Sequence, residues 1–308
     1  MTLLKMQISW KKRKESKMTV LMNIMASSVE IGLIFGVLAM GYMLSYKILE
    51  YYDLTLEGSY PLGAFLTAAA ITSGLNPYLG LVFSLLGGAA AGSITYFLYK
   101  KVKVEPLLTG ILTLTMLYSI NLKIKGVSNI PVAQYPSIFG TIPKIIILVV
   151  FVIIIKVLID YFLRSEQGYL LKVTGNNRKL VKALGKDPDT YVFLGLLISN
   201  ALIGLAGGLM TNYQGFADIG MGTAMIVTGL ASIIIGDTIG KNSTKLRDTT
   251  RAIIGAIVYR IISGIAIYFG LNPNDLKLIT ALIVIAFIAY NNYLGKKQYR
   301  KLVKNVRN

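Results

Sequence analysis

Long apolar runs separated by short polar segments dominate this sequence. The mostly apolar runs 29–49, 77–99 and 143–163 are typical, and charged residues gather between such runs. Each run has about the 20 residues that a helix needs to cross a hydrocarbon core of roughly 30 Å. A soluble domain would instead mix polar positions into its elements at a period of two or about 3.6. The pattern therefore predicts an all-α integral membrane protein.

The same pattern predicts about eight transmembrane helices and one additional segment. The expected spans are 29–49, 77–99, 105–121, 143–163, 191–213, 219–239, 252–270 and 277–294. The additional segment, 60–75, is shorter and contains Pro61 near its start. With the preceding loop outside and Lys100 inside, it would enter and leave on the outer side, as a re-entrant or broken helix. A slightly short ordinary span is the alternative.

The charges between the spans set the expected orientation. Cytoplasmic loops retain an excess of Lys and Arg, and segment 1–28 carries six basic residues against one acid. We therefore expect a cytoplasmic arm at 1–28, a permease domain at 29–294 with a basic cytoplasmic loop at 164–190, and a basic cytoplasmic tail at 295–308. Both termini would lie on the cytoplasmic side of the cell membrane.

Composition excludes several classes of function. The net charge of +18 follows from basic cytoplasmic loops and needs no nucleic-acid partner. The chain has no Cys and no His, which removes disulfides, thiolate metal sites and the commonest general base. It also has no G-x-x-x-x-G-K-[ST] loop that would hold ATP. We therefore expect a transport protein that is not an enzyme and has no metal site or cofactor of its own.

The loop 164–190 contains one short helix pattern, at 176–185. Asn176 or Asn177 would cap its N-terminus and Gly185 would end it. Leu180, Val181 and Leu184 would share one face, with Arg178 and Lys179 beside it. A capped helix fixed between two spans suits a groove on a partner protein. A helix lying on the lipid surface is the alternative.

Several polar residues within the spans are candidates for a translocation path. Arg260 lies near the middle of the run 252–270, where a charge implies a partner or a polar cavity. The alternative is an arginine that snorkels to the surface. The other candidates are Asn200, Asn212, Gln214 and Thr223. Glycines cluster at 87–92, 204–208 and 220–229, where they allow either close static packing or sliding helices.

One stretch resembles a known family. Gly175 and Asn177, then Leu184 and Gly185, then Asp189 are followed by Ser199, Ala201, Gly204, Leu205, Ala206 and Gly207. This order resembles the permeases of ATP-binding cassette importers of the branched-chain amino acid and ribose type. The chain departs from that family at Leu180 and Val181, where Ala-Ala is usual. Segments 53–65, 212–223 and 270–281 are similar to the subgroup that imports tryptophan and other aromatic amino acids.

The resemblance implies a homodimeric permease with the fold of the vitamin B12 importers. Two cytoplasmic ATPase subunits, which use ATP and Mg, would dock on the helix at 176–185. An extracytoplasmic solute-binding protein would deliver an amino acid, and the acidic residues Glu50, Asp53 and Glu57 are its expected contact. The implied coupling residues are Gly175, Asn176, Asn177, Arg178, Lys179, Leu180, Val181, Leu184 and Gly185.

The rival interpretation is an ion-coupled secondary transporter that works without an ATPase. Such a transporter needs acidic or other ion-binding groups near the middle of the membrane. The predicted spans contain few Asp and Glu residues. The permease interpretation is therefore favoured.

Overall fold

A computed structural model describes residues 2–140, 142–241, 243, 246–272, 275, 278–287 and 289, with side chains described from Met18 onward. The first half of the chain forms α1 (Thr2–Tyr42), the π-helix η1 (Met43–Ile48), α2 (Thr55–Thr72), α3 (Pro77–Lys100), α4 (Pro106–Lys125), β1 (Asn129–Pro131) and α5 (Lys144–Phe162). The second half forms α6 (Glu166–Asn176), α7 (Arg178–Ala183), α8 (Pro188–Gln214), β2 (Phe216–Asp218), the 3-10 helix η2 (Ile219–Gly222), α9 (Met225–Gly240) and α10 (Asp248–Tyr268). A further apolar helix covers Leu278–Phe287.

The architecture confirms an all-α membrane protein. Within the described residues, seven helices are long and apolar enough to cross a membrane. They correspond to the first seven expected spans, from 29–49 to 252–270. Of the expected last span, 277–294, only part lies within the described residues, and the tail 295–308 lies outside them. The total number of spans stays a prediction.

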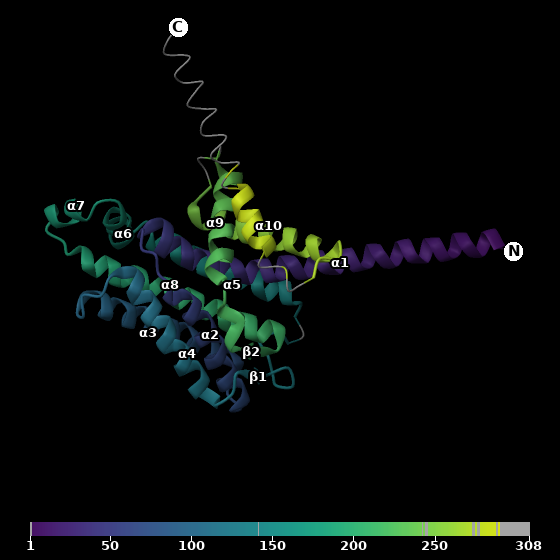
Figure 1. Cartoon of the computed structure of the whole chain (residues 1–308), viewed down its shortest axis with the longest axis horizontal. Helices are drawn as coiled ribbons and strands as arrows, with labels where there is room; N and C mark the ends of the chain where they lie inside the picture. The colour runs from purple at the N-terminus through teal and green to yellow at the C-terminus, as the bar shows by residue number, and fades with distance from the viewer. Residues whose placement is uncertain are drawn as a thin grey trace, which may run out of the picture.

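Helix α8 is the centre of the bundle. In its most apolar window 78% of the residues are buried, whereas the corresponding share is 28% in both α4 and α5. Helices α2, α3 and α1 pack directly around it (Figure 1). The glycine-rich sequence of α8 makes this possible, because residues without a Cβ let backbones approach closely.

The glycines at these helix crossings are in close contact with neighbouring backbone. A Cβ on Gly63 of α2 would overlap the backbone of Gly204 in α8, and one on Gly88 of α3 would overlap the backbone of Asn200. The same holds for Gly207 against Tyr60. These contacts favour the close-packing interpretation of the glycine clusters over sliding helices.

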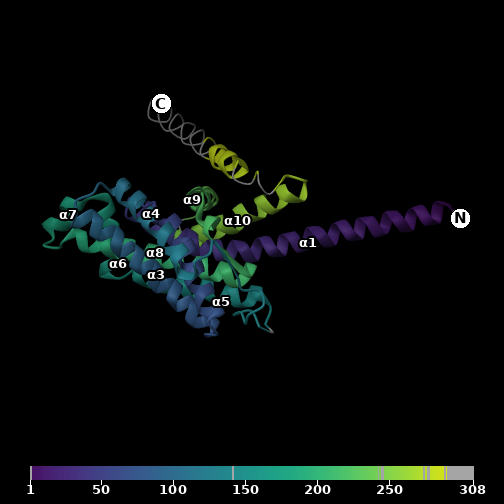
Figure 2. The ribbon, with the colours of Figure 1, turned by 60° about the horizontal axis from the view of Figure 1, so that its bottom comes forward.

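Helix α1 runs antiparallel to α8. The Tyr213 hydroxyl near the end of α8 donates to Glu30 Oε2 at 3.0 Å, whereas the carbonyl of Ile48 lies against Gly175 in α6. The start of α1 and the α6–α7 pair therefore lie at opposite ends of the bundle (Figures 1 and 2). The expectation that arm 1–28 and loop 164–190 face the same side is wrong. The charges of the arm alone could not place it, because positive-inside charge is a bias rather than a rule.

Helix α2 also corrects the predicted topology. Thr55 at its start shares a 2.7 Å hydrogen bond with Thr95, near the end of α3. Thr67 donates to the carbonyl of Gly80, near the start of α3, at 3.0 Å. The helix is therefore continuous and runs between the two ends of the bundle, antiparallel to α3. The expected re-entrant helix at 60–75 is wrong, and the alternative of a short ordinary span agrees with this course.

The chain after α8 turns back into the bundle before α9 begins. Strand β2 pairs with β1 in an antiparallel ribbon, and η2 then brings Gly222 against the carbonyl of Glu57 in α2. Ala224 has a left-handed φ of 64°, and α9 starts only at Met225. The predicted span 219–239 is therefore a 3-10 turn followed by a shorter α-helix.

Candidate functional site

Helices α6 and α7 form a compact unit at one end of the bundle (Figure 2). The Asn177 side chain accepts a hydrogen bond from Leu180 N at 3.1 Å and caps α7. Gly185 ends this helix with a left-handed φ of 73°. Both predicted caps are confirmed at 177 and 185, because capping depends on local backbone geometry that the sequence specifies.

The α7 helix has one anchored and one exposed face. Val181 is fully buried, while Leu180 and Leu184 are 46% and 55% exposed. The Arg178 guanidinium donates to the Tyr99 hydroxyl of α3 at 2.6 Å, which fixes the start of α7. The expected single face of Leu180, Val181 and Leu184 is therefore wrong. Val181 anchors the helix, and the two leucines, one helical turn apart, remain accessible.

The other members of the predicted coupling set lie around this exposed face. Asn176, Lys179 and Gly185 are exposed. Gly175 sits against the backbone of Ile48 and Leu49, so α6 is fitted closely to the end of η1. The structure thus brings the whole predicted set together at one end.

The acidic residues expected to meet a binding protein lie elsewhere. Glu50 follows directly after the Ile48–Leu49 backbone that contacts α6, and Asp53 is only 4% exposed. Glu57 Oε1 accepts from Ile226 N at the start of α9, at 3.3 Å. Glu50 therefore lies at the end of the bundle that carries 176–185, and not at the opposite end as expected, because α1 runs in the direction opposite to that predicted. Asp53 and Glu57 lie within the bundle.

Asp53 belongs to a buried polar chain that reaches the centre of α8. Asn200 Nδ2 donates to Asp53 Oδ2 at 2.7 Å, and Ser59 Oγ donates to Asn200 Oδ1 at 2.6 Å. The backbone N–H of Thr55 donates to the other Asp53 oxygen at 2.9 Å. Asn200 therefore connects the middle of α8 to Asp53, just before α2, and to Ser59 in the first turns of α2.

Replacing Asn200 with Leu is expected to destabilise the protein by about 3 kcal/mol, because the Asp53 carboxylate stays buried after losing its amide donor. The measurement is thermal unfolding of the detergent-purified chain. The double variant Asp53→Leu/Asn200→Leu should recover part of the loss, since both partners of the bond are gone. Strictly additive losses would show that the two side chains do not interact.

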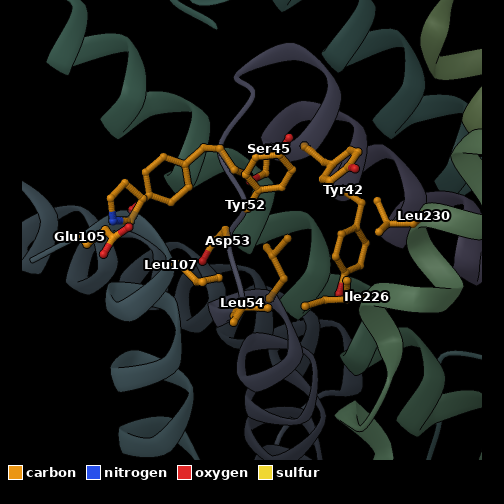
Figure 3. A pocket seen from close by; sticks show the side chains of 13 residues that line it. Tyr42, Ser45, Tyr52, Asp53, Leu54, Glu105, Leu107, Ile226 and Leu230 are labelled. Atoms are coloured by element: carbon orange, nitrogen blue, oxygen red, sulfur yellow. The ribbon is translucent and has the colours of Figure 1, made fainter.

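A cavity of about 550 Å³ opens beside this polar chain (Figure 3). It lies between η1, the start of α4 and α9. Its lining is aromatic and apolar, with the carboxylates of Asp53 and Glu105 among the labelled side chains. Four tyrosines contribute to it, namely Tyr42, Tyr46, Tyr51 and Tyr52. This cluster was not predicted from the sequence, although four tyrosines within 42–52 could have indicated an aromatic site.

The predicted path residues are distributed over three regions. Asn200 is buried in α8, as described above. Asn212 Oδ1 accepts from Ile138 N at 3.2 Å, and Gln214 donates to the carbonyl of Phe216, so both stabilise the end that bears the β1–β2 ribbon. Thr223 and Arg260 line a cavity of about 200 Å³ at the start of α9. The structure therefore brings together Thr223 with Arg260 and, at the ribbon end, Asn212 with Gln214, while Asn200 lies apart from both pairs.

Within the described residues, no cluster of three or more His, Cys, Asp or Glu side chains is arranged to hold a metal ion. The arrangement can instead hold a partner at α6–α7 and enclose small molecules in the bundle. Neither role requires bond-making chemistry from this chain.

Comparisons with known proteins add to this geometry. The family described as branched-chain amino acid transport system / permease component matches residues 24–289. The chain is 43% identical over 277 residues to a tyrosine transport system permease protein of Clostridioides difficile (strain R20291), covering 89% of this chain and 94% of that protein. It is 25% identical over 282 residues to a probable branched-chain amino acid transport permease protein LivH of Methanocaldococcus jannaschii, covering 83% and 86%.

A solved structure is similar in fold. The structure titled PsaBC from Streptococcus pneumoniae in complex with Fab contains a chain that aligns with a TM-score of 0.51 at 17% sequence identity. The alignment covers 87% of this chain and 90% of that one.

Proposed function

The chain belongs to the family of permease components of branched-chain amino acid transport systems, and from this premise we propose that it is driven by separate ATPase subunits that dock on α7. It is a multi-pass membrane permease of an ATP-binding cassette amino acid transport system. The observation that carries the docking assignment is the exposed Leu180–Leu184 pair on a helix that Val181 and Arg178 hold in place.

The course of the chain supports a mechanical role for α7. Only four residues separate α7 from α8, the most buried of the spanning helices. Lys100 of α3 pairs with Asp189 in the first turn of α8, and Asn200 links α8 to the start of α2. Force applied at α7 therefore has a rigid route to three helices of the bundle.

The docking assignment fixes an orientation in the cell membrane. With α6 and α7 in the cytoplasm, the β1–β2 ribbon and the start of α1 face outward. An extracytoplasmic binding protein would then meet the ribbon end, near Asn212 and Gln214, rather than Glu50, Asp53 and Glu57. The tail 295–308 lies outside the described residues, and its cytoplasmic position stays a prediction.

The proposed solute is an aromatic amino acid, with tyrosine first. The relative of 43% identity is named a tyrosine transport system permease. The tyrosine-lined cavity of about 550 Å³ lies in the size range of small-molecule sites and offers one place along the path where an aromatic side chain can stack on rings.

A second copy of the chain is the proposed partner within the membrane. Helix α4 is largely exposed, and its outward residues include Thr115, Tyr118 and Ser119. Polar groups facing lipid are costly, which favours a protein or water-filled surface opposite α4. A homodimer with its path between the two α4 helices satisfies this requirement.

The test is transport by the reconstituted system. The permease is placed in proteoliposomes with an ATPase and a solute-binding protein of the same transport system, and uptake of radiolabelled L-tyrosine and L-leucine is measured with and without ATP. ATP-dependent tyrosine uptake supports the proposal. Uptake that persists without the ATPase but follows an ion gradient would replace it with the secondary-transporter interpretation.

A further inference from the structure

Arg260, in the middle of α10, has no counter-charge among the residues that the structure describes. Its Cζ lies 3.7 Å from the centroid of the Phe35 ring and 5.8 Å from that of Tyr259. Its Nε is buried and has no hydrogen-bond partner. No carboxylate in the part of the chain that the structure describes forms an ion pair with it. Since charge inside a membrane protein is costly unless it is paired, a ligand is a candidate for the missing partner.

The cavity in front of Arg260 has the character of an anion site. Its volume is about 200 Å³, and its lining combines Arg260 with the hydroxyl-bearing residues Thr223, Thr228 and Ser263. The first turn of α9 also lines it, through residues 225, 227 and 228. A helix N-terminus carries partial positive charge, and in this turn the N–H of Ile226 donates to Glu57. No acidic residue is among the described residues that line this cavity.

The anion cavity adjoins a second cavity. Thr223 also lines a space of about 380 Å³ between α2, α4 and η2. Glu57 lines that second space, as does Asn121, whose two amide atoms are buried and without partners. Charged residues of opposite sign thus flank Thr223, Arg260 on one side and Glu57 on the other.

We propose that Arg260, together with the first turn of α9, binds the α-carboxylate of the transported amino acid. The inference rests on the proposed amino acid transport and adds the chemical group that is recognised. A guanidinium binds a carboxylate through two parallel hydrogen bonds. The ring stack on Phe35 holds the guanidinium plane in place, so little side-chain freedom is lost on binding.

The variant Arg260→Met separates this role from a packing role. Methionine keeps the apolar stem of the side chain to about the position of Nε but removes the guanidinium and its charge. If the arginine only packs against Phe35, Arg260→Met loses that ring contact but keeps the ligand response. If it binds a carboxylate, Arg260→Met folds normally, because a buried unpaired charge has been removed, yet it loses the ligand response. The matched control is Arg251→Met on the same helix. The guanidinium of Arg251 donates to the Ser243 carbonyl.

The experiment measures thermal unfolding of the full-length, detergent-purified permease against four probes. These are L-tyrosine, 3-(4-hydroxyphenyl)propionate, which keeps only the carboxylate, tyramine, which keeps only the ammonium, and sodium chloride. The wild-type midpoint is expected to rise with the two carboxylates and not with tyramine. Arg260→Met should raise the half-saturating carboxylate concentration at least about 10-fold, and Arg251→Met should respond as the wild type does.

Three results would overturn the inference. They are a response to tyramine equal to that of L-tyrosine, an unchanged carboxylate response in Arg260→Met, and a chloride response that accounts for the whole shift. The readout needs no ATPase, so it is independent of the docking assignment. Failure of ATP-dependent uptake with an intact carboxylate response would count against the proposed function alone.

Discussion

Replacing Leu180 and Leu184 together with glutamate is expected to abolish association with the ATPase and, with it, ATP-dependent uptake. Both side chains are exposed on α7, and each leucine buried in a partner groove contributes about 1.5–3 kcal/mol. Losing both, and placing two carboxylates in an apolar groove, should weaken binding at least about 100-fold. The measurement is co-purification of the ATPase with the tagged permease, together with uptake in proteoliposomes.

The control for this variant is Val102→Glu. Val102 is 55% exposed and follows α3 at the same end of the bundle, outside α6 and α7. It should retain the ATPase and transport. Undiminished co-purification in the double leucine variant would refute docking on α7. Charge reversal at Arg178 is less informative, because Arg178 also holds α7 to Tyr99 and its loss would move the helix.

Replacing Gly63 with alanine is expected to destabilise the bundle by at least about 2 kcal/mol, because overpacking that must move backbone is costly. The added Cβ would overlap the carbonyl group of Gly204, and neither helix can yield without separating α2 from α8. The apparent unfolding temperature of the purified protein should fall, and less protein should be recovered in monodisperse form after detergent extraction.

The matched control is the same substitution at Gly87. There the new Cβ would meet the end of the Leu66 side chain, which can adopt another rotamer. Gly87→Ala should therefore remain close to the wild type in unfolding temperature. Equal losses in the two variants would show that glycine content, rather than the α2–α8 backbone contact, determines the effect.

The local features of α7 could be predicted because each depends on a few neighbouring residues. Asn177 caps the helix through the N–H of Leu180, and Gly185 takes a left-handed conformation that other residues avoid. The direction in which Val181 points could not be predicted, since the buried face of so short a helix is determined by the α6 and α8 helices against which it packs. The length and apolarity of the spans could likewise be predicted, because a bilayer imposes them on each segment separately.

The sequence alone determined that this is an all-α membrane protein whose polar loop at 164–190 contains a capped helix, because hydropathy and capping are local properties. The tertiary structure alone decided the direction of α1, the continuous course of α2 and the position of Asp53. Each depends on contacts between segments far apart in the chain, such as Glu30 with Tyr213 and Asp53 with Asn200. A charge bias among loops is a weak constraint beside close helix packing, and where the two disagreed, the packing determined the topology.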